Sequence, residues 1–420
     1  MKVLILAEQC NPEWASVPLE AWSLYSALSR YCNCHLVTQI RNREALLRAG
    51  LKENIDFTII DSERIAAPAS KLSMILSGGK GKGWTTGTAI SSLTYYYYES
   101  LVWRKFKDKI KAKHFDLVHR ITPLTPTAQS LIAKSCKSVG VPFVLGPLNG
   151  GIPWPMEFDR ERRQENEWLS YVRGLYKLLP GYKSTLENSA AILCGSLYTK
   201  KHIPKKYQNK CYYIPENAIN PSLFNIKKNR HAQVPIRAIF VGRLVPYKGA
   251  DMVIEAAAEL IKNKKLTLEI VGDGPQLGQL KKLADNLNIL SDINFAGWIN
   301  HNIIQEKLAN SDIFTFPSIR EFGGGAILEA MAIGIVPIVV RYGGPSELAT
   351  EETGYFIELS SRVNIITELN SILNRICDSP SEIDKKSELA YRRVHTNFTW
   401  GKKAQDIIEI YKKISTISLT

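Results

Sequence analysis

Two cations stand beside a glycine turn in the second half of the sequence, where an apolar run ends. In the stretch FVGRLVPYKG, Arg243 and Lys248 follow the apolar run and Gly242. In a parallel α/β sheet, ligands bind at the carboxyl ends of strands, and a helix N-terminus carries positive partial charge. Two cations at such a place suit a diphosphate. The alternative, an Arg and a Lys merely solvated on a surface loop, weighs about equally on this pattern alone.

Two carboxylates flank three glycines further along, in PSIREFGGGAILEAMA. Glu321 precedes the glycines, and Glu329 lies one turn into the helix that they open. Glycines let a ligand approach backbone N–H groups, the helix N-terminus attracts phosphate, and carboxylates accept hydrogen bonds from hydroxyls. The alternatives are a partly exposed helix acid for Glu329 and an acid stabilised by the helix dipole for Glu321. The predicted lining of this cradle is Glu321, Phe322, Gly323, Gly324 and Glu329.

Two more turns follow apolar runs, VGDGP and FAGW. They contribute Gly272 and Asp273 from the first turn, and Gly297 and Trp298 from the second. If the sheet is parallel, both turns face the same crevice as the cations, and Gly297 permits close approach of a flat ligand such as a base. For Trp298 itself, packing in the core is the stronger alternative.

Short apolar runs alternate with helical patterns, which predicts an α/β protein with parallel sheets. We expect two Rossmann-like lobes, 1–214 and 215–398, facing each other across a cleft. The polar segment Asn220–Val234 is the predicted boundary, and the last helix, about 399–420, is expected to pack back on the first lobe. The predicted strands are Lys2–Ala7, His35–Gln39, Phe57–Asp61, Phe115–His119, Val141–Leu145, Ala190–Cys194, Ile236–Gly242, Leu266–Gly272, Ile293–Ala296, Ile313–Phe316 and Val336–Val340.

Charge is distributed unevenly over the 420 residues. The net charge is +14, and residues 1–214 hold 30 Lys and Arg against 17 Asp and Glu, whereas residues 215–420 hold 24 against 23. A basic half favours an anionic partner such as nucleic acid, anionic lipid or a phosphate-bearing acceptor, although a generally basic proteome is an alternative. No apolar run approaches the roughly 18 residues of a spanning helix. The seven scattered cysteines indicate reduced thiols in a cytosolic compartment.

The motifs GRLVPYKG, VGDGP, FAGW and PSIREFGGGAILEAMAIGIVPIVVRYGGPSEL resemble, in order and spacing, those of glycosyltransferase family 4. The resemblance implies a GT-B fold and a retaining, hexosyltransferase-type reaction from a nucleoside-diphosphate sugar to a glycan or lipid-linked acceptor. It implies that Arg243 and Lys248 contact the donor diphosphate, that Glu321 lies by the donor sugar, and that Glu329 binds the ribose. By the same resemblance, Gly323 and Gly324 lend backbone N–H groups to sugar and phosphate.

The first half departs from the family pattern. The loop Pro12–Pro18 lacks the family's glycine pair, and Gly146 stands where a donor-contacting His is common. The segment Gly146–Gly151, GPLNGG, resembles instead a subgroup with a GP-x-GG loop, which makes Asn149, Gly150 and Gly151 candidate residues on the acceptor side of the cleft. A different histidine, His119, ends a strand and is a candidate catalytic residue, although a histidine there is more often structural.

No D-x-D motif and no cluster with metal-ligand spacing occurs, so we expect neither a metal nor another cofactor. We expect cations and helix dipoles to stabilise the charge of the leaving group instead. Rival functions are a nucleotide-sugar epimerase and a non-catalytic nucleotide-sugar-binding subunit; nucleic acid is not an expected partner because it would not explain the four motifs. The basic, aromatic stretch Tyr95–Lys113 predicts a helix that docks the first lobe on an anionic membrane surface through Trp103 and Phe106. The alternative is that its aromatics pack into the lobe's own core.

Overall fold

The computed structural model describes residues 1–76, 84–164, 176–228 and 231–417, and the chain divides into two compact units. The first unit is Met1–Gly151, Glu165–Glu216 and Trp400–Thr420, and the second is Ile152–Gln164 and Asn217–Thr399. The chain therefore leaves the first unit twice and returns to it twice.

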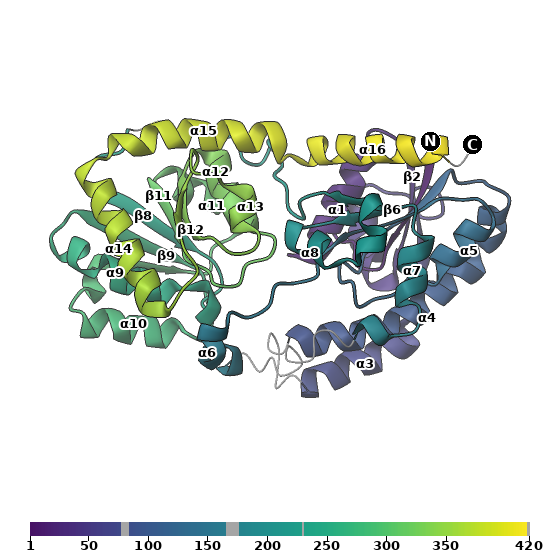
Figure 1. The fold of residues 1–420 in the computed structure, drawn as a ribbon, viewed down its shortest axis with the longest axis horizontal. Coiled ribbons are helices and arrows are strands. Elements are labelled where there is room, and N and C mark those ends of the chain that lie inside the picture. The colour runs from purple at the N-terminus through teal and green to yellow at the C-terminus, as the bar shows by residue number, and fades with distance from the viewer. Residues whose placement is uncertain (77–83, 165–175, 229–230, 418–420) are drawn as a thin grey trace. The chain divides into compact units, whose positions relative to one another are not determined.

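The first unit is built on a seven-stranded sheet in the order β3-β2-β1-β4-β5-β6-β7 (Figure 1). All its strand pairs are parallel. Its strands are β1 (Lys2–Ala7), β2 (Asn33–Gln39), β3 (Phe57–Ile60), β4 (Leu117–Thr122), β5 (Phe143–Leu148), β6 (Ala191–Cys194) and β7 (Cys211–Tyr213). Its helices include α1 (Val17–Leu28), α2 (Arg43–Arg48), α3 (Glu63–Leu76), α4 (Trp84–Lys111), α5 (Ile132–Ser138), α7 (Tyr182–Asn188), α8 (Leu197–His202) and α16 (Trp400–Ile417).

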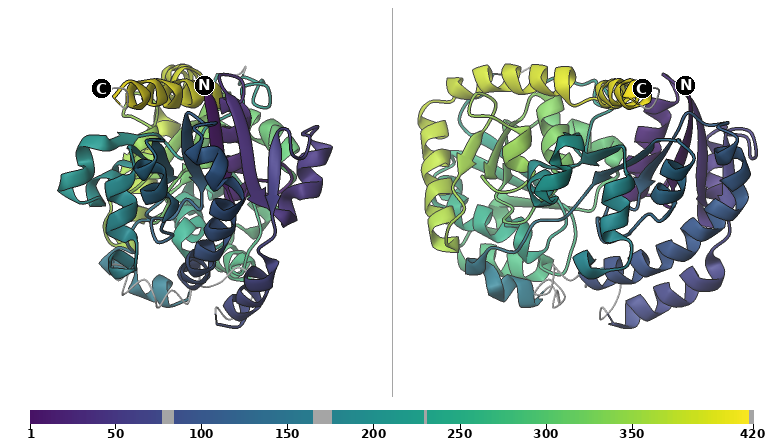
Figure 2. Two further views of the ribbon diagram at one scale, coloured as in Figure 1. Left: turned by 90° about the vertical axis from the view of Figure 1, so that its right-hand side faces the viewer. Right: turned by 45° about the vertical axis from the view of Figure 1, so that its right-hand side comes forward.

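Helices cover both faces of this sheet, so its central strand β1 is apolar at nearly every position. Val3 and Ile5 face one core and Leu4 and Leu6 face the other, as the alternation of side chains along a strand requires. The helix α16 lies against α1 (Figures 1 and 2) and completes the first of these cores. Its buried side chains recur at helical spacing, which explains why this late segment folds onto the sheet. They are Ala404, Ile407, Ile410, Tyr411 and Ile414.

The second unit contains a six-stranded parallel sheet in the order β10-β9-β8-β11-β12-β13. Its strands are β8 (Ile236–Val241), β9 (Leu266–Val271), β10 (Ile293–Gly297), β11 (Ile313–Phe316), β12 (Val336–Val340) and β13 (Tyr355–Ile357). Its helices are α6 (Asp159–Gln164), α9 (Ala250–Lys262), α10 (Leu277–Asn286), α11 (His301–Ala309), α12 (Gly325–Ile333), α13 (Pro345–Leu348), α14 (Arg362–Asp378) and α15 (Ser381–Asn397), with the short 3-10 helix η5 (Pro246–Lys248). One continuous core joins them.

Two details differ from the domain limits expected from the sequence. Residues 152–164, which we placed in the first lobe, pack with the second unit. The polar segment Asn220–Val234 is not a free linker, because its described residues pack on the second unit. Phe224 is buried in that unit's core, and the Lys228 ammonium forms an ion pair with Asp312 at 2.9 Å in the interior. Polar composition indicated a boundary, but one aromatic side chain and one buried ion pair hold the segment down.

Candidate functional site

The candidate site of the second unit lies in the loops that follow β8 and β11. Lys248 ends η5, just before α9, and Glu321 lies in the loop before α12. Their side chains form an ion pair, and each is only 16% exposed. The Glu321 carboxylate also accepts a hydrogen bond from the Gly324 N–H at 3.3 Å, where α12 begins. Three groups that the sequence predicted to share a site, a lysine, a carboxylate and a helix N-terminus, are therefore in direct contact.

Two aromatic rings lie close to the Lys248 ammonium. The Lys248 ammonium lies 4.9 Å from the ring centre of Phe316, the last residue of β11, and 5.8 Å from that of Tyr247. Such cation–π contacts favour a fixed position for the charge. Arg243 projects from the same loop and is exposed. The loop after β8 thus carries two cations, and cations form strong charge-assisted hydrogen bonds with phosphate.

Glu329 lies on the fifth residue of α12 and has an unusual acidity. Part of its side chain reaches the surface, but burial removes enough water to raise the pKa of its carboxyl to about 8. The carboxyl is therefore mostly neutral at pH 7, unlike an ordinary surface glutamate. Perturbed acids of this kind are enriched at binding sites.

Backbone hydrogen bonds join the carboxyl ends of β8, β9 and β10 at the glycines that the sequence singled out. The Gly242 N–H donates to Val271 O at 3.0 Å, and the Gly272 N–H donates to Gly297 O at 2.8 Å. A Cβ on Gly272 would lie 1.9 Å from Gly242 O, so this close approach alone requires glycine. Asp273 is exposed and its carboxylate accepts the Gly274 N–H at 2.7 Å. We therefore assign the N–H groups of Gly242 and Gly272 to joining the loops rather than to a ligand.

Trp298 is 75% exposed, so packing in the core, which we favoured for it, is wrong. Its indole stands at the carboxyl end of β10, beside Gly297, where a Cβ would meet nothing within 4 Å. A flat apolar side chain beside open space at a strand end is a surface on which a base can stack.

Sequence reasoning assigned no role to the loop after β12, which is hydrogen-bonded to the Glu321 loop. The Gly344 N–H donates to Glu321 O at 3.0 Å, and a Cβ on Gly344 would lie 1.9 Å from Phe322 O. Asn217 was also missed, and its amide lies close to Gly325 at the start of α12. The sequence signal for the loop after β12 was the glycine pair of RYGG, which follows a strand as the other glycine turns do.

His119 lies in β4 of the first unit and is fully buried. Its Nε2 lies 2.6 Å from Gly146 O, and its Nδ1 is hydrogen-bonded to the Tyr411 hydroxyl of α16. A carbonyl only accepts, so Nε2 carries the proton and Nδ1 accepts from Tyr411. Burial lowers the pKa of His119 to about 4, which keeps the ring neutral. Both nitrogens are engaged, and we assign His119 to the attachment of α16 rather than to catalysis.

The predicted acceptor-side residues lie at the carboxyl end of β5. The Asn149 N–H donates to Leu124 O at 2.7 Å, and its side-chain oxygen accepts the Gly151 N–H at 2.8 Å. The Gly150 N–H donates to Thr199 Oγ1 at 3.0 Å. The backbone N–H groups of the GP-x-GG loop are therefore bonded within their own unit, and the loop lies at the carboxyl ends of the strands, where ligands bind in such folds.

The helix α4 does not present the aromatic face that we predicted for membrane contact. Phe106 is 3% exposed within the first unit's core, and Trp103 packs against the same core. The alternative, that these aromatics are core residues, is correct. Lysines 105, 107, 109 and 111 remain exposed around the rest of the helix. Among the described residues, no helix combines the length and apolar character that a membrane crossing requires.

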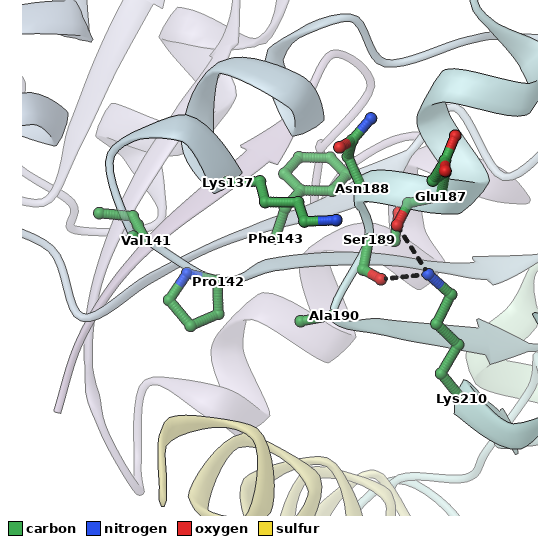
Figure 3. Close-up of a pocket in the computed structure, with 10 residues that line it drawn as sticks. Lys137, Val141, Pro142, Phe143, Glu187, Asn188, Ser189, Ala190 and Lys210 are labelled. Carbon is green, nitrogen blue, oxygen red and sulfur yellow. Dashed lines mark hydrogen bonds between the residues drawn. The ribbon is translucent and has the colours of Figure 1, made fainter. Parts of the chain in front are cut away.

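A pocket of about 400 Å³ opens at the amino-terminal ends of β5 and β6 (Figure 3). The GP-x-GG loop follows β5 and so lies at the opposite, carboxyl ends of these strands. Lys137, Glu187 and Lys210 line it together with apolar residues. The Lys210 ammonium donates to Glu187 O at 3.0 Å and Ser189 O at 2.8 Å, and so caps the end of α7. Its charge serves the helix, which explains one lysine of the basic half. No group of three or more metal-ligating side chains occurs in the part of the chain that the structure describes.

Two Rossmann-like units, each built on a parallel sheet, define a GT-B fold. Solved structures share it: a glycosyltransferase from Rickettsia africae has a TM-score of 0.63 at 17% identity, with 98% of each chain covered. The sucrose-phosphate synthase from Thermosynechococcus elongatus has a TM-score of 0.65 at 16% identity over 99% of each chain. A third, Alr3699/HepE from Anabaena in complex with UDP, has a TM-score of 0.61 at 15% identity and covers 98% of this chain and 100% of that one.

Sequence comparison gives the family. The model described as "Glycosyl transferases group 1" matches residues 222–388. A GDP-mannose-dependent monoacylated alpha-(1-6)-phosphatidylinositol monomannoside mannosyltransferase from Corynebacterium glutamicum is 30% identical over 287 residues, 65% of this chain and 70% of that protein. The chain belongs to the glycosyl transferases group 1 family.

Other relatives match over shorter stretches. An uncharacterized glycosyltransferase of Methanocaldococcus jannaschii is 24% identical over 47% of this chain. The GPI3 subunit of yeast phosphatidylinositol N-acetylglucosaminyltransferase is 22% identical over 46% of it. The matches span 52% and 42% of these two relatives, about half of their length.

Proposed function

We propose that this chain is a retaining glycosyltransferase of family 4 that transfers a hexose from a nucleoside-diphosphate sugar to a hydroxyl of a glycan or lipid-linked acceptor. The observation that carries the proposal is the contact of Lys248 and Glu321 at the start of α12. A cation for phosphate and a carboxylate for sugar hydroxyls are thereby held next to each other, as a sugar phosphate requires.

Each group then has one task in the reaction. Lys248 and Arg243 stabilise negative charge on the diphosphate as the bond between it and the sugar C1 breaks, and the N-terminus of α12 adds its partial charge. Glu321 orients the sugar, and Glu329 binds the ribose. The acceptor oxygen bonds to C1 on the face that the phosphate leaves, and its proton passes to the departing phosphate oxygen. That course retains the anomeric configuration and needs no metal.

The relatives favour a lipid-linked acceptor. The names of the corynebacterial and yeast relatives both include the lipid phosphatidylinositol. A role in surface polysaccharide or glycoconjugate assembly on the cytoplasmic face of a membrane would present such an acceptor. The exposed lysines of α4 would then meet anionic head groups, each contributing about 1 kcal/mol.

A thermal-shift panel of UDP-, GDP- and ADP-sugars tests the donor class. A ligand that binds only the folded protein raises Tm, by an amount that follows its affinity. One base should stand out from the other two. A rival epimerase would interconvert the sugar when given donor alone, whereas a transferase needs the acceptor, so product analysis without acceptor separates them. The anomeric proton of the product, observed by NMR, tests retention.

Variants of the two cations test the site. Arg243→Ala and Lys248→Ala are each expected to lose most transfer with an unchanged fold, because a charge-assisted hydrogen bond to phosphate is worth about 1.5–3 kcal/mol and more in the transition state. Lys282→Ala, an exposed lysine of α10 in the same unit, is the matched control. Near-normal turnover in both variants would show that the diphosphate binds elsewhere and would favour a non-catalytic role.

A further inference from the structure

The segment that begins the second unit packs beneath the candidate site, although it comes from the first half of the sequence. Ile152 follows directly on Gly151, the last residue of the GP-x-GG loop, yet it belongs to the second unit. Trp154 is 7% exposed and lies in that unit's core. Its indole meets the ring of Tyr247 edge-on, with centroids 5.7 Å apart and planes at 88°. The guanidinium of Arg320 lies 5.1 Å from the same indole.

Both neighbours of Trp154 adjoin the ion pair in sequence. Tyr247 precedes Lys248 and Arg320 precedes Glu321. The carbonyl of Tyr247 accepts hydrogen bonds from Ser318 Oγ and Ile319 N, each at 3.0 Å. The loops that carry the lysine and the carboxylate are therefore joined to each other and share one aromatic contact.

The same segment is also hydrogen-bonded to the loops after β11 and β12. Arg320 Nε donates to Ile152 O at 3.2 Å, and the Tyr342 hydroxyl, in the loop after β12, donates to Pro153 O at 3.0 Å. Three loops, those after β8, β11 and β12, thus meet on residues 152–154. The segment is therefore placed to fix the spacing of the three loops.

We infer that Trp154 is a positioning residue of the donor site, which holds Lys248 and Glu321 at the separation that the donor requires. It acts through Tyr247 and Arg320 and does not touch the donor itself. Removing the indole leaves the backbone of both loops in place but frees their side chains to shift. Binding and transfer both depend on placement to within about 1 Å, so such a shift weakens both, in addition to the stability that the fold loses with a buried indole.

The inference rests on the proposed donor site. It is tested by binding of UDP, GDP and ADP, measured by calorimetry well below Tm, and the variants are compared with the nucleotide that the wild type binds most tightly. Trp154→Ala is expected to lower the affinity about ten-fold, and Trp154→Phe, which keeps an aromatic ring, to recover much of it. Phe158→Ala is the matched control, because Phe158 is buried in the same segment and core. It should lower Tm and leave the affinity unchanged.

A second background shows whether Trp154 acts through the lysine. In Lys248→Ala, the further change Trp154→Ala should cost little additional affinity, since coupled residues are not additive. Full additivity would overturn the inference, and so would wild-type affinity in Trp154→Ala or an equal loss in Phe158→Ala. If Lys248→Ala weakens binding while Trp154→Ala does not, the donor site stands and the inference alone fails. If the wild type binds none of the three nucleotides, the proposed function fails and the inference with it.

Discussion

Mild acid is expected to loosen α16 from the first unit, and His119 is the reason. The ring is neutral in the fold, with Nε2–H on Gly146 O and Nδ1 accepting from Tyr411. Protonation would place a second N–H and a charge inside the core, opposite a hydroxyl that now donates. Burial therefore lowers the pKa of His119 to about 4, from about 6.5 in an unfolded chain.

The sign follows from linkage. A histidine whose pKa is depressed by folding contributes stability that is fully present above about pH 6.5 and is lost as the pH falls towards 4, because the unfolded state then binds more protons. The complete shift corresponds to roughly 3 kcal/mol at about 1.36 kcal/mol for each pKa unit. Between about pH 7.5 and about pH 5 the loss is about 2 kcal/mol, or roughly 30-fold in the opening equilibrium.

Hydrogen exchange in β4 and α16 measures this opening free energy locally. His119→Gln is the comparison, because an amide offers Gly146 a donor and Tyr411 an acceptor without titrating. Burial raises the pKa of Glu8 and of Glu99 to about 7, and these acids act in the opposite direction, since their contribution is lost as the pH rises. They are common to both proteins and cancel in the difference. A difference between wild type and variant that is equal at both pH values would refute the reasoning.

Three further predictions concern the donor, the metal and the membrane. Glu329→Gln should weaken nucleoside-diphosphate binding, and the loss should be larger at about pH 9 than at about pH 6.5. The wild-type carboxyl, with its pKa of about 8, is ionised at the higher pH and then is a charged acceptor whose hydrogen bond is worth about 1.5–3 kcal/mol. An equal loss of affinity at both pH values, measured by calorimetry, would contradict this. Transfer should persist in excess EDTA, and complete loss rescued by Mg²⁺ or Mn²⁺ would show that a metal stabilises the leaving group. In vesicle sedimentation, binding of the protein should require anionic lipid, weaken as salt rises, and fall when Lys107, Lys109 and Lys111 are replaced by Glu. Equal binding to neutral vesicles would show that the exposed lysines of α4 do not bind the membrane.

Most of the fold could be predicted from the sequence because its central strands are buried on both faces. Eleven runs that are nearly continuous in apolar residues match β1 to β6 and β8 to β12, mostly within two residues at each end. The two strands that were not predicted, β7 (Cys211–Tyr213) and β13 (Tyr355–Ile357), are three residues long and lie at sheet edges. Three residues carry no periodicity, so only pairing with a neighbour makes them strands.

The residues of the candidate site also differ in whether a local sequence pattern could predict them. Lys248 and Glu321 could be predicted because each follows a strand and adjoins a turn, and parallel strands bring such turns together. Trp154 could not, because about a hundred residues of sequence separate it from Tyr247 and no local pattern predicts that contact. His119 shows the converse limit, since a strand-end histidine has the same sequence whether its ring meets a cleft or, as here, the hydroxyl of Tyr411.

The return of residues 400–417 to the first unit has a consequence for synthesis. A ribosome makes β1 to β7 early, but the core that contains Val3, Ile5 and Leu24 stays open on one side until Tyr411 and Ile414 have emerged. The second unit, whose residues all precede Trp400, can fold while the first still waits. The amino-terminal half thus has an uncovered apolar face until residues 400–417 have been made, which is the condition under which nascent chains recruit chaperones. Ribosome stalling before about residue 400 should therefore leave this half protease-sensitive, although all seven of its strands have been made.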